Sequence, residues 1–256
     1  MCRLVGYLGK PIFLEQLLSI PSHNLVVQSY QPRQMTSGLL NADGFGFGWY
    51  GSDRPLVYRQ VLPIWNDPNV AELAQYVQSH SLVANVRSAT PGLPVDLSNC
   101  QPFRWGKWLF LHNGFIQDFR RLVARSMRDR LADQFEQQIM GNTDSEYIFS
   151  WFLHYLNQAN SATEALHLTL QEFKDLVKGA GTSASVNLIL TDGVRMWAVR
   201  SGIGAIAPSL YWQESPTGIT IASEPLELAD PSWQSVPESS LLLVEPQQVR
   251  VTPLKF

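Results

Sequence analysis

The sequence has little charge and no concentration of one sign. Only 16% of its 256 residues are charged, and 19 basic against 22 acidic residues give a formal net charge of −3. No run of like charge is long enough to bind nucleic acid phosphates or an anionic lipid surface. We therefore expect neither nucleic acid nor a membrane as a partner.

Cysteine is almost absent. Cys2 and Cys100 are too few for a disulfide framework, which a chain of this length does not need. No apolar stretch approaches the roughly twenty residues of a membrane helix, and no basic and apolar leader precedes the first predicted strand. These features predict a cytoplasmic protein.

Residue pairs suited to binding metals or nucleotides are also missing. The five histidines are scattered, so we expect no metal, no cofactor and no Cys-His catalytic pair. The glycine-rich segment 44–48 resembles a phosphate-binding loop only in composition, because Trp49 and Tyr50 extend it as a strand and not as a helix. Its glycines are expected to let strands pack closely beside Cys2.

Hydrophobic periodicity and turn residues predict strands at both ends of the sequence and helices in the middle. This order favours antiparallel sheets with helices on their outer faces over a parallel doubly wound fold. We expect one α+β domain spanning residues 1–256, which a four-layer α/β/β/α sandwich of two stacked, mainly antiparallel sheets would accommodate. The predicted strands cover residues 2–8, 45–50, 56–61, 82–87, 107–112, 185–191, 194–200, 210–213, 219–222 and 241–244, and the predicted helices 28–34, 67–79 and 118–179 in several pieces.

Cys2 is the most informative single residue. Removal of Met1 before so small a side chain would leave a residue with both a thiol and a free α-amine. The amine, with a pKa near 8, could act as the base for a thiol with a pKa near 8.5. Taken alone, a small buried residue at a strand start is the favoured interpretation.

Asn113 and Gly114 follow a hydrophobic strand and could form an oxyanion hole. An amide side chain and a neighbouring backbone N–H would each contribute on the order of 3 kcal/mol to a tetrahedral intermediate. The alternative is a two-residue Asn-Gly hairpin turn. The helix predicted after Gly114 weakens that alternative.

Arg87 and Asp144 could bind the two charged groups of an amino acid. The Arg87 guanidinium, at a strand end, could hold an α-carboxylate with two hydrogen bonds, and Asp144, before a helix, could hold an α-ammonium group. Individually, a surface strand residue and an ordinary helix cap are the simpler interpretations.

Taken in order, six motifs along the chain resemble the class II glutamine amidotransferase domain, and a seventh near residue 224 is also similar to that family. The resemblance covers about the whole chain, and the ordered set is far more specific than any one motif. The motifs are Met1-Cys2-Arg3, Asp43-Gly44-Phe45-Gly46, Val86-Arg87-Ser88-Ala89-Thr90, Asn99-Cys100-Gln101-Pro102-Phe103, His112-Asn113-Gly114, Thr143-Asp144-Ser145-Glu146 and Ala222-Ser223-Glu224-Pro225-Leu226.

The resemblance implies an α/β/β/α sandwich of the N-terminal-nucleophile hydrolases and a role for each site residue. Cys2 is then the nucleophile and its α-amine the base. Asn113 and Gly114 supply the oxyanion donors. Arg87, Thr90 and Asp144 bind the glutamyl head group. Cys100 is expected to pack inside its motif, and Asn85 stands where many relatives carry histidine.

The implied activity is cleavage of a γ-glutamyl amide with release of glutamate. Synthetic members of the family carry a long acceptor domain, so the 256-residue chain favours hydrolysis. Among short members it is most similar to the amidohydrolases of ergothioneine biosynthesis, which act on γ-glutamyl-hercynylcysteine sulfoxide. The alternatives are a glutaminase subunit that supplies ammonia to a separate synthase and a non-enzymatic γ-glutamyl-metabolite sensor. The loop 90–104 is expected to set specificity, and a homo-oligomer stays open.

Overall fold

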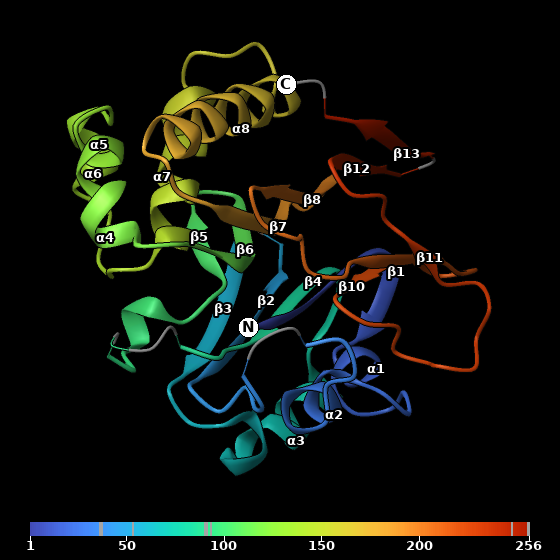
Figure 1. Cartoon of the computed structure of the whole chain (residues 1–256). Helices are drawn as coiled ribbons and strands as arrows, with labels where there is room; N and C mark the ends of the chain where they lie inside the picture. The colour runs from blue at the N-terminus through green and yellow to red at the C-terminus, as the bar shows by residue number, and fades with distance from the viewer. Residues whose placement is uncertain (36–37, 53, 90–91, 93, 247, 255–256) are drawn as a thin grey trace.

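A computed structural model describes residues 1–35, 38–52, 54–89, 92, 94–246 and 248–254. Two β-sheets are stacked face to face, and helices cover the outer face of each (Figure 1). The predicted four-layer α/β/β/α sandwich of α+β class is therefore confirmed.

The seven-stranded sheet holds the first strand of the chain at its centre. Its strands pair in antiparallel fashion, and β1 lies between β10 and β4. In spatial order its strands are β11 (Gln234–Ser235), β9 (Tyr211–Glu214), β10 (Gly218–Ala222), β1 (Arg3–Phe13), β4 (Gln78–Val86), β2 (Phe45–Tyr50) and β3 (Pro55–Gln60).

The six-stranded sheet is also antiparallel and contains the strand predicted to carry the oxyanion hole. That strand, β6, lies between β5 and β7. In spatial order the strands are β13 (Gln248–Pro253), β12 (Ser240–Glu245), β8 (Met196–Ile203), β7 (Ala184–Thr191), β6 (Trp108–Ile116) and β5 (Phe103–Trp105).

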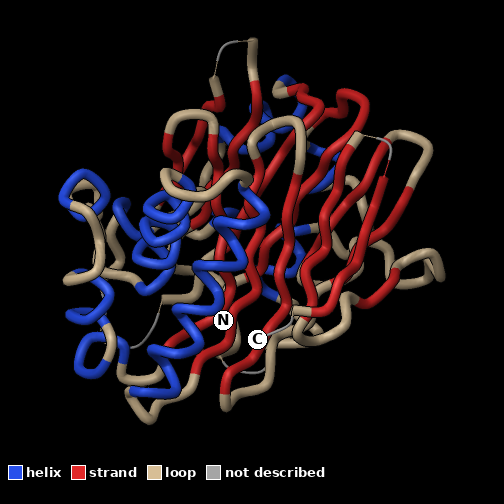
Figure 2. The backbone as a smooth tube through the Cα atoms, turned by 90° about the horizontal axis from the view of Figure 1, so that it is seen from above, coloured by secondary structure: helices blue, strands red, loops and turns tan. Residues whose placement is uncertain are grey.

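The helices form two outer layers. Three helices lie below the seven-stranded sheet in Figure 1. Of the other five, the two longest lie above the six-stranded sheet and the three short ones lie at its left, and the view from above also shows helices over the strands (Figure 2). The first group is α1 (Glu15–Leu18), α2 (Leu25–Tyr30) and α3 (Asn69–Tyr76); the second is α4 (Phe119–Leu122), α5 (Ala124–Arg128), α6 (Asp133–Glu136), α7 (Asp144–Leu156) and α8 (Ala162–Gly179), and short 3₁₀ turns are η1 (Ile64–Asn66) and η2 (Leu97–Asn99).

Alternation along the strands divides the core into layers. Leu4, Val83 and Leu111 belong to the buried cluster between the two sheets, whereas Val5 and Tyr7 pack in the cluster beneath α1 and α2. Side chains on successive strand residues point to opposite faces. Cys2, two residues before Leu4, therefore shares the parity of the inter-sheet face.

Several predicted boundaries are wrong. Helix α2 ends at Tyr30, so residues 31–34 are not helical, and the hairpin between β7 and β8 uses the four residues 192–195 and not two. Strands β5, β11 and β13 were not predicted. Strand β6 runs on to Ile116, beyond the predicted end at residue 112.

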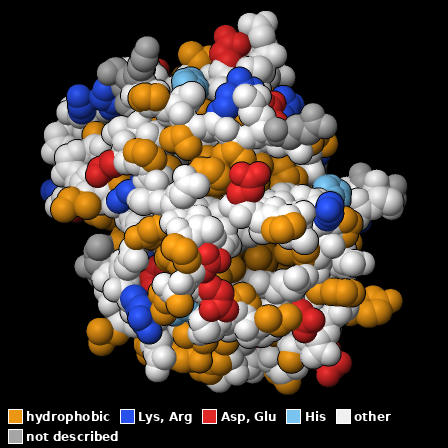
Figure 3. Space-filling view, turned by 90° about the vertical axis from the view of Figure 1, so that its right-hand side faces the viewer, with side chains coloured by type: hydrophobic (Ala, Val, Ile, Leu, Met, Phe, Trp, Pro, Cys, Tyr) orange, Lys and Arg blue, Asp and Glu red, His pale blue; other side chains and the backbone are white. Residues whose placement is uncertain are grey.

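Lys and Arg side chains are scattered among hydrophobic and acidic groups on the face shown in Figure 3. Within the described part of the chain, no helix is both long and apolar enough to cross a membrane.

The glycines of β2 let the second sheet approach the first closely. A Cβ on Gly46 would lie 2.2 Å from the carbonyl oxygen of Gln101, and one on Gly48 would lie 2.8 Å from Leu109 Cδ1. Real Cβ atoms do not come so near a backbone oxygen, so the backbone would have to shift. The expected close packing at the 44–48 segment is confirmed.

Replacing Gly46 with alanine is expected to lower the free energy of unfolding by about 1–3 kcal/mol, because overpacking displaces the 101–102 backbone. Urea denaturation measures this change. Gly179→Ala is the matched control, since nothing lies within 4 Å of its added Cβ. Equal stability of the two variants would contradict the close approach.

Candidate active site

Cys2 lies at the entrance to the central strand of the seven-stranded sheet. Arg3 is opposite Val86 in the pairing of β1 with β4, so the next step of the register places Cys2 beside Arg87. The Cys2 Sγ lies 3.9 Å from the carbonyl oxygen of Ser88, and the side chain is only partly buried. The structure thus brings Cys2 and the end of β4 together.

The chain terminus lies in the same place. Burial lowers the pKa of the Met1 α-amino group; the Arg3 charge acts in the same direction, and Cys2 and Asp43 oppose it. A neighbouring segment also reaches the terminus, because a Cβ on Gly38 would lie 3.7 Å from the Met1 nitrogen. The first residues are therefore enclosed and not frayed.

Arg87 is buried, with 4% of its surface exposed. Its Nη1 donates to the Asp43 carbonyl oxygen at 3.0 Å, and its backbone N–H donates to the Gly44 carbonyl oxygen at 2.8 Å. The interpretation of Arg87 as a surface strand residue is wrong. Its guanidinium, which has five N–H donors, makes one hydrogen bond to a described residue, so donors remain for a carboxylate.

Asn113 is fully buried on β6, opposite Asn187 of β7. Among the described residues, neither its Oδ1 nor its Nδ2 has a hydrogen-bond partner. Asn113 has the parity of Leu109 and Leu111, which face the space between the sheets. A buried, unpartnered amide is costly unless another group binds it, which is the pattern of a ligand-binding side chain.

A series of hydrogen bonds connects Asn187, the residue opposite Asn113, to the Cys2 strand. The Asn187 amide donates to the Ser209 carbonyl at 3.1 Å, and the Ser209 hydroxyl donates to the Ser223 carbonyl at 2.8 Å. Ser223 in turn exchanges two hydrogen bonds with Leu4, one through its side chain and one through its backbone. This chain of contacts links the six-stranded sheet to the residue two positions after Cys2.

Gly114 lies within β6 and does not form a turn. It pairs with Val186, and a Cβ at this position would lie 2.0 Å from the Ser185 carbonyl oxygen. The alternative of an Asn-Gly hairpin turn is therefore wrong. The interpretation that Asn113 and Gly114 end the strand is also wrong, because they lie three and two residues before its end.

His112 supports these residues from the helix side. Gln101 clamps its backbone by accepting from its N–H at 2.6 Å and donating to its carbonyl at 3.0 Å. Its ring Nδ1 lies 2.9 Å from the Ser145 hydroxyl. Burial lowers the pKa of His112, which favours the neutral ring. The ring therefore supports the strand next to Asn113 by packing and hydrogen bonding.

Asp144 begins α7 close to the end of β6. Its Oδ2 accepts from the Ile116 N–H at 2.9 Å, and its Oδ1 accepts from the Ser145 N–H at 2.8 Å. The Ser145 hydroxyl also donates to Oδ1, at 3.3 Å, so Oδ2 is the oxygen that keeps a lone pair for a further donor. No hydrogen bond or ion pair among the described residues joins Asp144 to Cys2 or Arg87, and Thr90 lies outside the described residues.

Three residues quoted in the motifs, but given no role from sequence, shape the surrounding loops. Asn99 accepts from the Asn142 N–H at 3.0 Å, and Glu146 accepts from the N–H groups of Met140 and Gly141 at 2.9 and 2.7 Å. Their occurrence in the ordered motifs was the available signal. The third, Glu224, forms an ion pair with Arg3, the first residue of the Cys2 strand.

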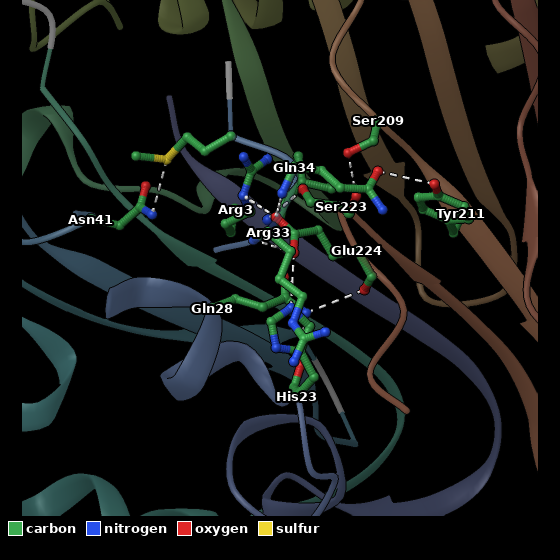
Figure 4. A network of polar contacts seen from close by, with 12 residues as sticks. Arg3, His23, Gln28, Arg33, Gln34, Asn41, Ser209, Tyr211, Ser223 and Glu224 are labelled. Carbon is green, nitrogen blue, oxygen red and sulfur yellow. Dashed lines mark hydrogen bonds and ion pairs between the residues drawn. The ribbon is translucent and has the colours of Figure 1, made fainter. Parts of the chain in front are cut away.

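Glu224 is fully buried, and its carboxylate collects several donors (Figure 4). Arg3 Nε and His23 Nε2 lie 3.1 and 2.8 Å from its oxygens, and the backbone N–H groups of Arg33 and Gln34 donate at 2.9 and 3.0 Å. Burial alone would raise the pKa of Glu224, but these hydrogen bonds and the Arg3 charge together hold it below its usual value.

Cavities occur elsewhere on the molecule. One of about 330 Å³ lies between Leu122 and Ala180, and one of about 130 Å³ lies beside Tyr7 and Trp233. Neither is lined by Cys2, Arg87 or Asn113. No group of three or more His, Cys, Asp or Glu side chains among the described residues is placed to hold a metal ion.

The four-layer sandwich is the fold of one class of protein, the N-terminal-nucleophile hydrolases. Comparison with known proteins narrows this class. Residues 14–208 match the family model of class-II glutamine amidotransferases, and the chain belongs to that family. It is an amidohydrolase.

Relatives and solved structures agree with this assignment. A gamma-glutamyl-hercynylcysteine sulfoxide hydrolase of Mycolicibacterium smegmatis is 34% identical over 99% of this chain and 100% of its own length. One of Mycobacterium tuberculosis is 33% identical, over 99% and 97%.

A glutamine aminotransferase class-II domain protein from Silicibacter pomeroyi superposes with a TM-score of 0.74 at 25% identity, covering 98% of this chain and 99% of that one. The glutamine phosphoribosylpyrophosphate amidotransferase of B. subtilis shares the fold with a TM-score of 0.67 at 14% identity, over 99% of this chain and 49% of that one.

The two thiols are expected to differ in reactivity. Cys100 is fully buried against the Gln60 and Asp96 carbonyls, and burial raises the pKa of its thiol, whereas Cys2 is partly exposed. Iodoacetamide at neutral pH should therefore alkylate Cys2 at least about tenfold faster. Peptide mass spectrometry measures both rates, and faster labelling of Cys100 in the folded protein would contradict the assignment.

The Glu224 carboxylate predicts acid-sensitive stability. Its folded pKa is below the unfolded value of about 4.3, so its contribution is present above that value and lost as the pH falls through the folded pKa. Glu224→Gln should lose about 3–5 kcal/mol at neutral pH, because Arg3 becomes an uncompensated buried charge, and should show a shallower acid slope. Urea denaturation between about pH 3 and 7 measures both effects; parallel pH curves for wild type and variant would contradict them.

Proposed function

We propose that this amidohydrolase cleaves γ-glutamyl-hercynylcysteine sulfoxide by nucleophilic catalysis at Cys2. The observation that carries the mechanism is the buried Asn113 amide, which is unpartnered among the described residues and shares with Cys2 the parity of the inter-sheet face. The substrate is proposed because two relatives named as hydrolases of this compound match nearly the full chain.

The proposed reaction proceeds in two stages. The Cys2 thiol gives its proton to the residue's own α-amine and attacks the γ-carbonyl carbon, forming a carbon–sulfur bond. Asn113 and the Gly114 N–H stabilise the resulting oxyanion. The carbon–nitrogen bond then breaks, the amine leaves with the proton, and water cleaves the thioester to release glutamate and restore the thiol.

The glutamyl head group is proposed to bind between two charged residues. Arg87 has unassigned donors for the α-carboxylate, and the Asp144 carboxylate has lone pairs for the α-ammonium group. Thr90 is proposed to assist. An amino acid head group gripped at both ends would explain preference for γ-glutamyl amides over simple amides.

The mechanism requires a free α-amine on Cys2. A retained Met1 would acylate that amine and remove the proposed base, so Met1 must be cleaved from the active enzyme. Intact mass paired with activity tests this requirement. Full activity in protein that retains Met1 would rule out the amine as base.

The wider setting is also proposed. We infer that residues 1–256 form a single domain acting on a small molecule in the cytoplasm, which the two free cysteines support. Ammonia supply to a synthase is the alternative for the partner question. Glutaminase activity that rises only when a co-purified synthase and its acceptor are present would favour that alternative.

Cys2→Ala is expected to lower glutamate release by on the order of 10⁴-fold or more, because the nucleophile is lost. Coupled glutamate detection on γ-glutamyl-hercynylcysteine sulfoxide and on free glutamine measures it. Cys100→Ala is the control and should keep most of the activity. Turnover by Cys2→Ala near the wild-type rate would refute the mechanism, and preference for glutamine would refute the substrate.

A further inference from the structure

Glu224 connects two parts of the chain that flank Cys2. Its oxygens receive Arg3 from the nucleophile strand and two backbone N–H groups from the loop that follows α2 (Figure 4). His23 completes the set from the segment before α2. Glu224 belongs to the 222–226 motif, which has no role in the proposed amide-cleavage mechanism.

The contact with Arg3 fixes the nucleophile strand from beneath. Arg3 immediately follows Cys2 and is fully buried, and none of its three guanidinium nitrogens has a hydrogen-bond partner among the described residues. Among those residues its ion-pair partner is Glu224, at 3.1 Å from Nε. A buried cation with one counter-charge is held tightly to it, since separation would leave two uncompensated charges.

The backbone contacts fix a second element, which we call the wall loop and define as residues 31–35 with Gly38. Glu224 accepts from the N–H groups of Arg33 and Gln34. The Gln34 side chain is tied separately, because its Oε1 accepts from the Tyr211 hydroxyl at 2.9 Å. The wall loop is therefore attached to β9 and to Glu224, the second residue after β10.

The wall loop also reaches the nucleophile. A Cβ on Gly38 would lie 3.5 Å from the Ser88 hydroxyl and 3.7 Å from the Met1 nitrogen. The carbonyl oxygen of the same Ser88 lies 3.9 Å from the Cys2 thiol. The loop that Glu224 holds therefore borders the start of the chain on the side of the β4 end.

We propose that Glu224 is a positioning residue that holds the Cys2 strand and the wall loop in one fixed relation, so that both are already in place when the γ-glutamyl group binds at Cys2. This inference rests on the proposed role of Cys2. Glu224 binds the loop through the backbone N–H groups of Arg33 and Gln34, and Tyr211 adds a second contact through the Gln34 side chain. Loss of the relation weakens substrate binding when the loop moves and slows chemistry when the strand moves.

The experiment separates these two effects. Tyr211→Phe removes one hydroxyl that holds only the wall loop, and it is expected to raise KM threefold or more with kcat within twofold of wild type. Tyr58→Phe is the matched control: it removes a hydroxyl that donates to Asp67 at 2.6 Å, and Tyr58 lies on β3, which β4 and β2 separate from β1. The control should leave both parameters unchanged, and thermal melting should confirm that all proteins are folded.

Glu224→Gln loosens both elements and is expected to lower kcat/KM tenfold or more per folded molecule, with both kcat and KM affected. Glu224→Asp keeps the charge and should recover part of the loss. The substrate in each assay is the γ-glutamyl amide that the wild type turns over, and circular dichroism gives the folded fraction.

The outcomes are distinguishable. Unchanged kcat and KM in folded Glu224→Gln would overturn the inference, and so would equal KM values for Tyr211→Phe and Tyr58→Phe. If Glu224→Gln does not fold, the two tyrosine variants decide. Cys2→Ala is measured in parallel: an active Cys2→Ala would overturn the proposed function, whereas an inactive one beside unaffected Glu224 and Tyr211 variants would overturn the positioning role alone.

Discussion

The position of Cys2 depends on the pairing of β1 between β4 and β10. A residue at a chain terminus is ordinarily mobile, and a mobile nucleophile would lose the advantage of fixed geometry. Here the strand begins at Arg3 and is bonded on both sides within a few residues. Arg3 and Ser223 add side-chain contacts at the same level, so the whole seven-stranded sheet holds the terminus in place.

The second sheet supplies the groups that Cys2 lacks. Strand β6 brings Asn113 to the inter-sheet space, and the glycines of β2 allow the Gln101 segment to pack closely enough to clamp His112. A larger residue at either place would separate the sheets. The proposed catalytic groups are thus assembled by packing between layers and not by any one loop.

The sequence predicted the layers of the fold and the site motifs, but it did not predict which residues some of the motif side chains contact. Ordered motifs carried Cys2, Arg87, Asn113 and Asp144, and alternation located most strands. Asn113-Gly114 resembled a strand end because local propensity cannot show that Ser185 lies against Gly114. Glu224 had no predictable role, because its donors come from residues about 190 to 220 positions away in the chain. Only the fold brings them together.

The most direct measurement is the identification of the covalent intermediate. Enzyme quenched with acid during turnover of a γ-glutamyl amide should carry a γ-glutamyl group, and fragmentation should place it on the sulfur of an N-terminal Cys2 with Met1 removed. The same experiment on Cys2→Ala should give no adduct. A γ-glutamyl group on Cys100, or active enzyme that accumulates none under rapid quenching while Met1 is still attached, would contradict the account.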